Sequence, residues 1–297
     1  MPLLTIFTPT YNRAHTLPRT YRSLLRQENK DFIWLIVDDG STDNTREMVD
    51  SWTKLQSGFE IRYIYKENGG MHTAHNTAYE NIDTELNTCI DSDDELAEGA
   101  VEYIIRFWKK YGGDSYAGIV GLDADLNTGK VIGTRFPKGM KETTLGVFYR
   151  NGGRGDKKLV YRTDLMKKIP PYPVFEGEKY VYLSYKYGIC DKMYPLLTTN
   201  KILCNVEYQQ DGSSMNMIRQ YRRNPKGFAF LRKNNLLSED RSIGWLYKEA
   251  VHYVSSSMIG KNPHFIRESP RKGLTVLAVP PGIVLAGYIA WKTSGKP

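Results

Sequence analysis

The alternation of apolar runs and amphipathic segments over the first 112 residues constrains the fold of this chain most. Four runs rich in Ile, Val, Leu and aromatic residues have the length and composition of buried strands, at residues 3–8, 32–38, 61–66 and 86–91. Each is followed by a segment with apolar residues at helical spacing, at residues 17–26, 41–52, 72–82 and 98–111. Strands that alternate with helices form a sheet that is mostly parallel and covered on both faces. The sequence therefore predicts an α/β fold with a Rossmann-like, mostly parallel sheet flanked by helices.

Composition narrows the classes of partner. The chain has 297 residues and a formal net charge of +8, which suits nucleic acid, anionic lipid or phosphorylated ligands. No arginine-rich run or zinc-finger spacing indicates nucleic acid, so we expect none as a partner. Three cysteines at no metal-ligand spacing fit a reducing cytosol, and the N-terminus lacks the charged and apolar regions of a signal peptide.

Unusual polar groups follow each of the four predicted strands. They are Thr8–Thr10, Asp38–Ser41, Asn68–Gly70 and Asp91–Asp94. Ligands of an open α/β sheet bind outside the carboxyl ends of its strands. We therefore expect these four segments to converge on one crevice and to form a binding site.

Three aspartates lie within four positions in the stretch TCIDSDDEL, where mutual repulsion is costly unless something neutralises it. A divalent cation at Asp91 and Asp93 would do so, because hard cations such as Mg²⁺ and Mn²⁺ take oxygen ligands and a diphosphate completes their shell. The alternative is an acidic helix start, in which Asp94 and Glu95 favour the dipole of the next helix. The triplet alone does not separate the two.

Two further motifs have both a functional and a structural interpretation. In VDDGSTD, Asp38 and Asp39 can accept a hydrogen bond from a base edge or a ribose, although the same residues are common in turns and caps. The NGG segment can let a ligand approach the backbone closely, or can be a flexible turn. His72 and His75 lie three positions apart without a third ligand nearby, which argues against a zinc site.

Taken together, FTPTYNR, VDDGSTDNT, KENGG with the AHN after it, and CIDSDD occur in an order that resembles the family 2 glycosyltransferases, which use the nucleotide-sugar-binding GT-A fold. DKKLVYRTDLMKK, FEGEKY and EYQQDGSSMN with RNPKG resemble a bacterial branch of polysaccharide and cell-surface glycan type. The resemblance covers residues 3–228. It implies a GT-A domain at 1–228, with a nucleotide-binding half at 1–112 and an acceptor half at 113–228, before a helical extension at 229–297.

The resemblance implies an inverting transfer from a nucleoside-diphosphate sugar, typically UDP-linked, to a hydroxyl of a lipid-linked or polysaccharide acceptor. Asp39 matches the position that accepts from uracil N3–H, and Asp93 matches the direct ligand of Mn²⁺ or Mg²⁺, with Asp91 as its partner in the D-x-D motif. Glu178 in FEGEKY is the expected catalytic base and Glu176 the second choice. The other positions implied for the nucleotide are Thr8, Pro9, Thr10, Asn68, Gly69, Gly70, Asp91 and Ser92.

The sequence departs from the pattern of this branch at one position. Met71 stands where the branch often has Lys after NGG, so a cationic contact to phosphate or sugar is either missing or supplied by Lys66, His72 or Arg154. Without the family match, Glu178 would be interpreted as a solvated loop carboxylate paired with its lysine neighbour.

Other classes of function fit the sequence less well. A nucleotidyltransferase also uses paired aspartates and a parallel sheet, but no glycine-rich basic loop for a triphosphate lies near the N-terminus. A non-catalytic nucleotide-sugar-binding component of a polysaccharide complex would not need both the D-x-D triplet and a candidate base. A dinucleotide-dependent dehydrogenase would need a G-x-G-x-x-G motif after the first strand, which this chain lacks.

The C-terminal stretch Leu274–Trp291 holds 18 uncharged residues, near the lower limit for crossing a bilayer as a helix. Pro280 and Pro281 would break it in the middle, and basic residues flank it on both sides. We expect the segment to dip into the cytoplasmic leaflet and return, with Tyr288 and Trp291 at the interface. The protein would then be cytoplasmic and peripheral on the inner face of the cell membrane. The alternative is a helix–turn–helix packed against the catalytic domain.

Overall fold

The computed structural model describes residues 2–207 and 216–294, so most of the EYQQDGSSMN motif lies outside the described residues. The chain forms two compact units. Unit 1 comprises Met1–Pro171 and Lys186–Tyr208, and unit 2 comprises Tyr172–Tyr185 and Gln209–Pro297. This division differs from the expected boundary at residue 228, because the FEGEKY segment and the helices that begin at residues 217 and 225 belong to unit 2. The functional halves of the chain stay predictions.

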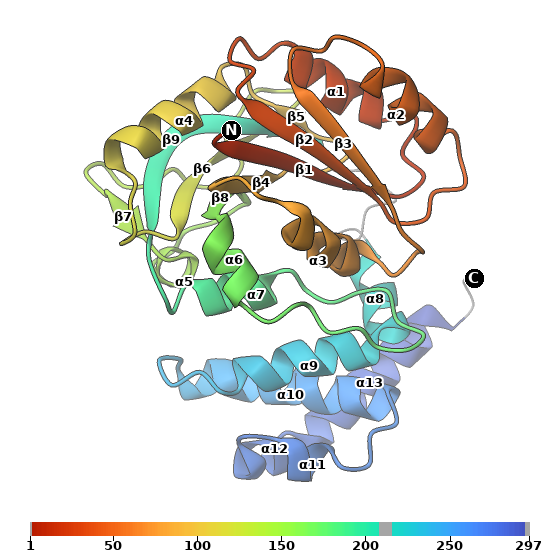
Figure 1. Cartoon of the computed structure of the whole chain (residues 1–297). Helices are drawn as coiled ribbons and strands as arrows, with labels where there is room; N and C mark the ends of the chain where they lie inside the picture. The colour runs from red at the N-terminus through yellow and green to blue at the C-terminus, as the bar shows by residue number, and fades with distance from the viewer. Residues whose placement is uncertain (1, 208–215, 295–297) are drawn as a thin grey trace. The chain divides into compact units, whose positions relative to one another are not determined.

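The first part of unit 1 is the predicted succession of strands and helices (Figure 1). Four neighbouring parallel strands lie in the order β3-β2-β1-β4. The strands are β1 (Leu4–Thr10), β2 (Phe32–Asp38), β3 (Glu60–Tyr65) and β4 (Leu86–Cys89), and the helices are α1 (Leu17–Leu25), α2 (Thr45–Thr53), α3 (Met71–Asn81) and α4 (Ala100–Tyr111). The carboxyl ends of the four strands therefore lie at one edge of the sheet, as the sequence predicts.

The rest of unit 1 widens the sheet with strands of mixed direction. Beyond β4 the order continues β8-β6-β9-β5, and β7 pairs with β9. These strands are β5 (Glu95–Leu96), β6 (Gly118–Asp125), β7 (Glu142–Thr143), β8 (Lys157–Arg162) and β9 (Leu196–Val206), and the helices of this part are α5 (Leu145–Arg150), α6 (Thr163–Lys168) and α7 (Ser184–Cys190). β8 runs antiparallel to both β4 and β6, whereas β6 and β9 are parallel. The sheet is thus parallel in its first half and mixed in its second.

Alternate residues of the central strands pack against helices on opposite faces of the sheet. Leu4 and Trp34 belong to a core shared with α1, α2 and α4. Phe7 points to the other face, where its ring meets the rings of His75 and Tyr79 in α3. Figure 1 shows α1, α2 and α4 on one face and α3 on the other. Because helices cover both faces, the strand ends are the part of the sheet open to a ligand.

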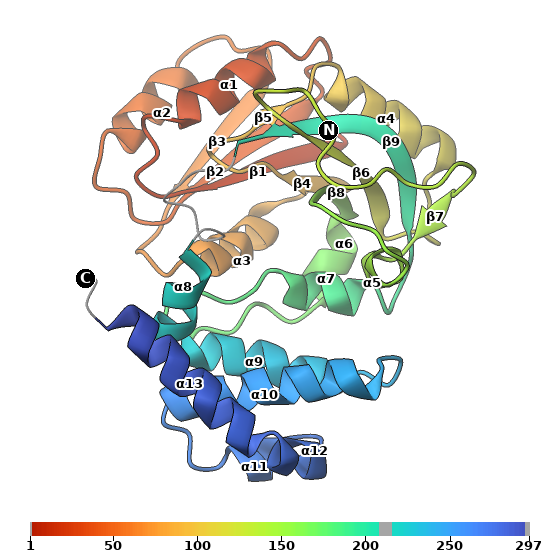
Figure 2. The same ribbon diagram turned by 180° about the vertical axis from the view of Figure 1, so that it is seen from behind.

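Unit 2 is built from helices. They are α8 (Met217–Arg223), α9 (Pro225–Asn235), α10 (Ile243–Ile259), α11 (Phe265–Glu268), α12 (Lys272–Leu277) and α13 (Val279–Thr293). α9 runs beside α10 and α13 crosses it obliquely (Figure 2), and the core of this unit includes Leu236, Tyr253, Val254 and Ala278. Within residues 2–207 and 216–294, no helix is long and apolar enough to cross a membrane. The expected helical C-terminal region is confirmed.

Candidate active site

Backbone hydrogen bonds hold the strand-end segments of unit 1 side by side. The amide of Asp39 donates to the carbonyl of Thr10 over 2.8 Å, and the amide of Ile90 donates to the carbonyl of Phe7 over 2.9 Å. Because β1 lies between β2 and β4, the segments that follow these two strands begin on either side of it. The structure therefore brings the VDDGSTD motif and the aspartate cluster to one edge of the sheet.

Asp39 makes most of the polar contacts on this edge. Its carboxylate accepts hydrogen bonds from the amides of Gly69 and Gly70 over 2.9 and 2.7 Å, and from the ammonium of Lys66 over 2.6 Å. These bonds fold the NGG loop onto the end of β2, and Gly70 takes a φ of 94° that favours glycine. Oδ1 accepts from Lys66 and from the amide of Gly69, whereas Oδ2 accepts from the amide of Gly70, so Oδ2 has a second lone pair for a further donor. Lys66 is the donor on a flexible side chain.

The threonines expected at the nucleotide have different surroundings. Thr8 is fully buried, and its hydroxyl accepts from the indole N–H of Trp34 over 3.0 Å, so its side chain supports the sheet from within. The buried hydroxyl of Thr10 has no hydrogen-bond partner among the described residues. Pro9 lies between them in β1. The roles of these residues toward a nucleotide stay predictions, and Thr10 is the one with an unused polar atom.

Three side chains were proposed to supply the cationic contact that Met71 cannot make, and two of them remain candidates in the structure. Met71 itself is exposed at the start of α3. Lys66 is bound to Asp39, and Arg154 is exposed. His72 is buried, and burial lowers its pKa to about 4, so it is neutral at physiological pH. A cationic contact from Lys66 or Arg154, or none at this position, stays a prediction.

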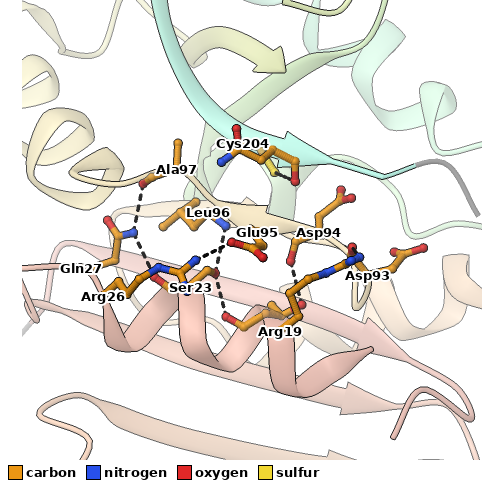
Figure 3. A network of polar contacts seen from close by, with 12 residues as sticks. Arg19, Ser23, Arg26, Gln27, Asp93, Asp94, Glu95, Leu96, Ala97 and Cys204 are labelled. Carbon is orange, nitrogen blue, oxygen red and sulfur yellow. Dashed lines mark hydrogen bonds and ion pairs between the residues drawn. The ribbon is translucent and has the colours of Figure 1, made fainter. Parts of the chain in front are cut away.

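Helix α1 holds the backbone of the segment that contains the D-x-D triplet (Figure 3). The hydroxyl of Thr20 donates to the carbonyl of Asp94 over 2.8 Å, and the guanidinium of Arg19 donates to the carbonyl of Asp93. Further along α1, the hydroxyl of Ser23 accepts from the amide of Leu96, and Gln27, two residues after the end of the helix, donates to the carbonyl of Ala97. The carboxylates of the triplet therefore extend from a backbone that a neighbouring helix fixes at several points.

Glu207, directly after β9, ties this segment to another strand. Its amide donates to the carboxylate of Asp94 over 3.3 Å, and its carboxylate accepts from Arg19 over 2.7 Å. Arg19 thus contacts both the backbone of the triplet and the end of β9. Since the side chain of Asp94 is buried and serves the fold, the exposed Asp91 and the half-buried Asp93 are the carboxylates of the cluster available to a ligand.

The aspartate cluster shifts the pKa values of its members upward. Burial, followed by the charge of Asp91, raises the pKa of Asp93 to about 6 and that of Asp94 to about 8. Lys158 is the buried cation near these groups. Although burial disfavours its charged form, acidic neighbours that include Asp123 and Asp94 raise the pKa of Lys158 above its usual range. The site concentrates negative charge that a cation would neutralise.

Two carboxylates are too few to hold a cation by themselves. In the part of the chain that the structure describes, no three His, Cys, Asp or Glu side chains are grouped so that they could hold a metal ion. Asp91 and Asp93 nevertheless fit the donor set that Mg²⁺ and Mn²⁺ use when substrate phosphates complete the shell. A metal at this site would depend on a bound diphosphate.

The two candidate bases lie in unit 2 and have different surroundings. Glu178 is 8% exposed, and its two oxygens accept from the amides of Lys226 and Gly227, each over 2.9 Å. These amides belong to the first turn of α9, which begins at Pro225, where backbone N–H groups have no partner within the helix. Glu178 therefore caps α9 and is not a solvated loop carboxylate. Glu176 is exposed.

The residues that support the triplet were not predicted from the sequence. Arg13 closes the FTPTYNR motif, and its charge opposes the upward shift in the pKa of Asp93. Lys158 stands in the strand sequence KKLVYR, where a basic residue next to apolar ones can signal a buried partner. Arg19 gives no such signal, since it contacts residues 74 and 188 positions away in the sequence.

Comparison with known proteins identifies the family. The model of glycosyl transferase family 2 matches residues 5–169, which is more than half of the chain. The chain belongs to glycosyl transferase family 2. The resemblance found in the motifs is confirmed. The matched residues contain the VDDGSTD motif with Asp39, called the Asp39 loop below, as well as the NGG loop and the D-x-D triplet of this family 2 protein.

Curated relatives match part of this family 2 chain. A Bacillus subtilis (strain 168) protein named as a glycosyltransferase of teichuronic acid biosynthesis, TuaG, is 32% identical over 106 residues, which cover 36% of this chain and 42% of that protein. The GalNAc(5)-diNAcBac-PP-undecaprenol beta-1,3-glucosyltransferase of Campylobacter jejuni is 31% identical over 108 residues, covering 36% and 34%. The chain thus matches less than half of the length of these relatives.

Solved structures with the same fold span nearly the whole chain. S. aureus TarS 1–349 in complex with UDP-GlcNAc has a TM-score of 0.60 at 16% identity, covering 98% of this chain and 92% of that one. The mannosyltransferase PcManGT from Pyrobaculum calidifontis, in complex with GDP-Man and Mn²⁺, has a TM-score of 0.55 at 14% identity, covering 100% and 77%. At these identities the likeness shows the fold alone, and it confirms the expected GT-A fold.

Proposed function

We propose that this family 2 protein is an inverting glycosyltransferase that moves a sugar from a UDP-linked donor to a hydroxyl of a lipid-linked or polysaccharide acceptor. The observation that carries the proposal is the D-x-D triplet at the end of β4, at the same sheet edge as the Asp39 loop. The TarS structure that contains UDP-GlcNAc supports the choice of donor. The relative named for an undecaprenol-linked substrate supports the choice of acceptor.

Asp91 and Asp93 would hold Mn²⁺ or Mg²⁺ together with the diphosphate of the donor. A cation bound there would stabilise the charge that develops on the leaving nucleoside diphosphate. Arg19 and Thr20 contribute by fixing the backbone from which these carboxylates extend. The PcManGT complex, which contains Mn²⁺, supports the metal assignment.

Asp39 is the proposed acceptor for the nucleobase. A uracil or thymine N3–H would donate to the second lone pair of Oδ2 or take the place of the Lys66 ammonium on Oδ1, while the two amides of the NGG loop stay bound. The PcManGT complex contains a guanosine nucleotide, so the fold does not fix the base. UDP binding more tightly than GDP is expected from this role, and the reverse order in a competition titration would refute it.

A carboxylate of the FEGEKY segment is the proposed proton acceptor. The acceptor hydroxyl must lose its proton as it attacks the anomeric carbon, and a carboxylate within hydrogen-bond reach can take it. Glu178 is the first candidate from the family match and Glu176 the second. The hydrogen bonds of Glu178 to α9 give it a structural role as well, so variants of both residues are needed to assign the base.

Slow hydrolysis of the donor tests the proposed reaction. The purified protein is incubated with a panel of nucleotide sugars and Mn²⁺, and release of the nucleoside diphosphate is measured. We expect UDP-sugars to be hydrolysed fastest by the wild type and not by Asp93→Asn, with the exposed Asp31→Asn as the matched control. Release of pyrophosphate from nucleoside triphosphates would favour a nucleotidyltransferase, and donor binding without turnover would favour a non-catalytic component.

The proposal includes a place of action on the inner face of the cell membrane, where a lipid-linked acceptor is presented. In this proposal the protein is cytoplasmic and peripheral, and its C-terminal helices hold it at the membrane. The support for that attachment lies in unit 2 and is independent of the donor site.

A further inference from the structure

Helices α12 and α13 both expose large apolar side chains. The outer face, as we call it, consists of Val276, Leu277, Ile283, Val284, Tyr288 and Trp291. Its most exposed members are Trp291, Val284 and Leu277, at 72%, 71% and 68%. Along α13 the exposed positions recur at helical spacing, so they form one side of the helix. Exposed apolar patches of this kind mark sites of interaction.

The opposite side of the same helices is packed, which fixes the direction of the outer face. Gly282 lies so close to α10 that a Cβ atom built there would be 2.5 Å from a methyl carbon of Val254. Thr275 is fully buried, and its hydroxyl is bonded to that of Ser269 over 2.6 Å. Ile289 is buried as well. The helices therefore cannot rotate to bury the outer face without breaking this packing.

Charge and aromatic residues around the outer face fit an anionic lipid surface. Residues 269–297 contain no Asp or Glu. Lys272 and Lys292 are exposed, one before the outer face and one at its end. Tyr288 and Trp291 lie together, with ring centroids 6.2 Å apart. Aromatic rings with polar tips and flanking lysines are the side chains that settle at a membrane–water interface.

One side of these helices packs within unit 2, and the dip into the leaflet and return that the sequence suggested stays a prediction. No helix among the described residues is long and apolar enough to cross a membrane, and α13 is held against α10 by its other side. The prolines stand in the first turn of α13, where a proline is tolerated, and do not break it. The side of α13 away from the outer face packs on α10 of the same unit. The alternative of packing against the catalytic domain stays a prediction.

We propose that the outer face of α12 and α13 binds a membrane surface that carries anionic headgroups, with the two helices lying in the plane of the interface. The apolar side chains of the outer face enter the boundary between headgroups and acyl chains, and Lys272 and Lys292 remain at the level of the phosphates. This site is separate from the donor site and uses no residue of it. A second copy of the chain or another protein is the competing occupant.

Sedimentation with vesicles tests the proposal on the full chain. The wild type should bind vesicles of phosphatidylcholine mixed with phosphatidylglycerol and should bind vesicles of phosphatidylcholine alone much more weakly. Leu277→Glu with Val284→Glu should reduce binding by at least about tenfold, because two apolar side chains leave the interface and two negative charges face the anionic headgroups. Leu55→Glu is the matched control, because Leu55 is 60% exposed in unit 1. Removing each lysine, as Lys272→Gln or Lys292→Gln, should weaken binding about fivefold, which corresponds to ~1 kcal/mol per basic residue.

Tryptophan fluorescence gives a second measurement that does not depend on the charged variants. Vesicles should shift the emission of the wild type to the blue and brominated lipid should quench it, and Trp291→Phe should remove both effects. The proposal is overturned if the wild type ignores anionic vesicles, binds neutral vesicles equally well, or loses as much binding in Leu55→Glu. It is also overturned if sedimentation velocity shows a dimer that Leu277→Glu dissociates, because the outer face would then join two copies. Donor hydrolysis should be unchanged in Leu277→Glu, so the result stands apart from the proposed reaction.

Discussion

Replacing Glu178 by Gln separates a structural role of this residue from a catalytic one. The change keeps the shape of the side chain but leaves one accepting oxygen where there were two. It also turns an amide NH₂ group toward a backbone N–H of α9. Either Lys226 or Gly227 then loses its acceptor. Because Glu178 is 8% exposed, water replaces that acceptor poorly.

The cost follows from two contributions. A hydrogen bond to a charged group contributes about 1.5–3 kcal/mol, and a negative charge at a helix N-terminus adds about 0.3–1 kcal/mol. Glu178→Gln should therefore lower the free energy of unfolding of unit 2 by about 2–4 kcal/mol. Glu176→Gln is the matched control, because Glu176 is exposed and such substitutions stay within about 0.5 kcal/mol.

Hydrogen exchange measured by mass spectrometry reports on this helix directly. In Glu178→Gln the amides of the first turn of α9 should exchange at least about thirtyfold faster, the factor that corresponds to ~2 kcal/mol. Urea unfolding followed by circular dichroism gives the same free energy independently. Equal exchange in Glu178→Gln and Glu176→Gln would show that Glu178 does not cap α9.

Transfer rates of the same two variants assign the base. If Glu178 acts only as a cap, transfer should fall with the unfolded fraction and recover on cooling. If it also takes the proton, turnover should fall by about 10²–10⁴ in folded protein, with donor binding retained. A loss of that size in Glu176→Gln, with Glu178→Gln active when folded, would place the base at Glu176.

Three further changes have expected outcomes. Asp93→Asn should abolish transfer without unfolding the protein, and EDTA should do so reversibly; full activity in EDTA would remove the metal role. His75 is fully buried and burial lowers its pKa from 6.5 to about 3, so this side chain takes up a proton when the protein unfolds. Between pH 6.5 and 5 the free energy of unfolding of the wild type, measured in urea, should therefore fall by about 2 kcal/mol relative to that of His75→Gln. Arg232 binds the buried Glu249 through bonds of 2.8 and 2.9 Å; Arg232→Met should cost about 3–5 kcal/mol in thermal unfolding, and adding Glu249→Leu should restore most of it.

The first half of the sheet could be predicted because its sequence pattern reports its surroundings. β1 and β2 are covered on both faces, so nearly every residue is apolar or small, and the helices between strands show one apolar side. The direction of β8 could not be predicted. Whether a strand runs parallel or antiparallel depends on which partners it meets, and β8 meets β4 and β6, which are distant in sequence from each other.

In the apolar tail, composition alone could not distinguish the side of the helix that packs within the protein from the side that is exposed. α13 is apolar on its packed side because it contacts α10, and apolar on its outer side as well. The sequence alone counts both sides together and therefore suggests entry into a bilayer. Gly282, which allows the close approach to Val254, gives no sign in the sequence of where its partner lies.

Residues at the candidate site were predicted by type and position but not by contact. Asp39 and the NGG loop were expected to surround one ligand, and the structure shows that they bind each other. Glu178 was chosen for catalysis and is found at the start of α9, in contact with amides 48 and 49 positions away. Such long-range hydrogen bonds join segments whose local sequence patterns are independent of each other, so no sequence motif predicts them.

The three aspartates after β4 do not share one role. Asp94 belongs to the fold, because its buried carboxylate accepts from the amide of Glu207. Asp93 and Asp94 both have pKa values raised by burial and by the charge of Asp91, so ionising them at neutral pH lowers the stability of the folded state. If the fold needed only the carboxylate of Asp94 as an acceptor, the folded state would be more stable with Asn or Ser in place of Asp91 and Asp93. Destabilising charge that the fold does not use is typical of functional sites, which favours a bound cation at Asp91 and Asp93 over an acidic helix start.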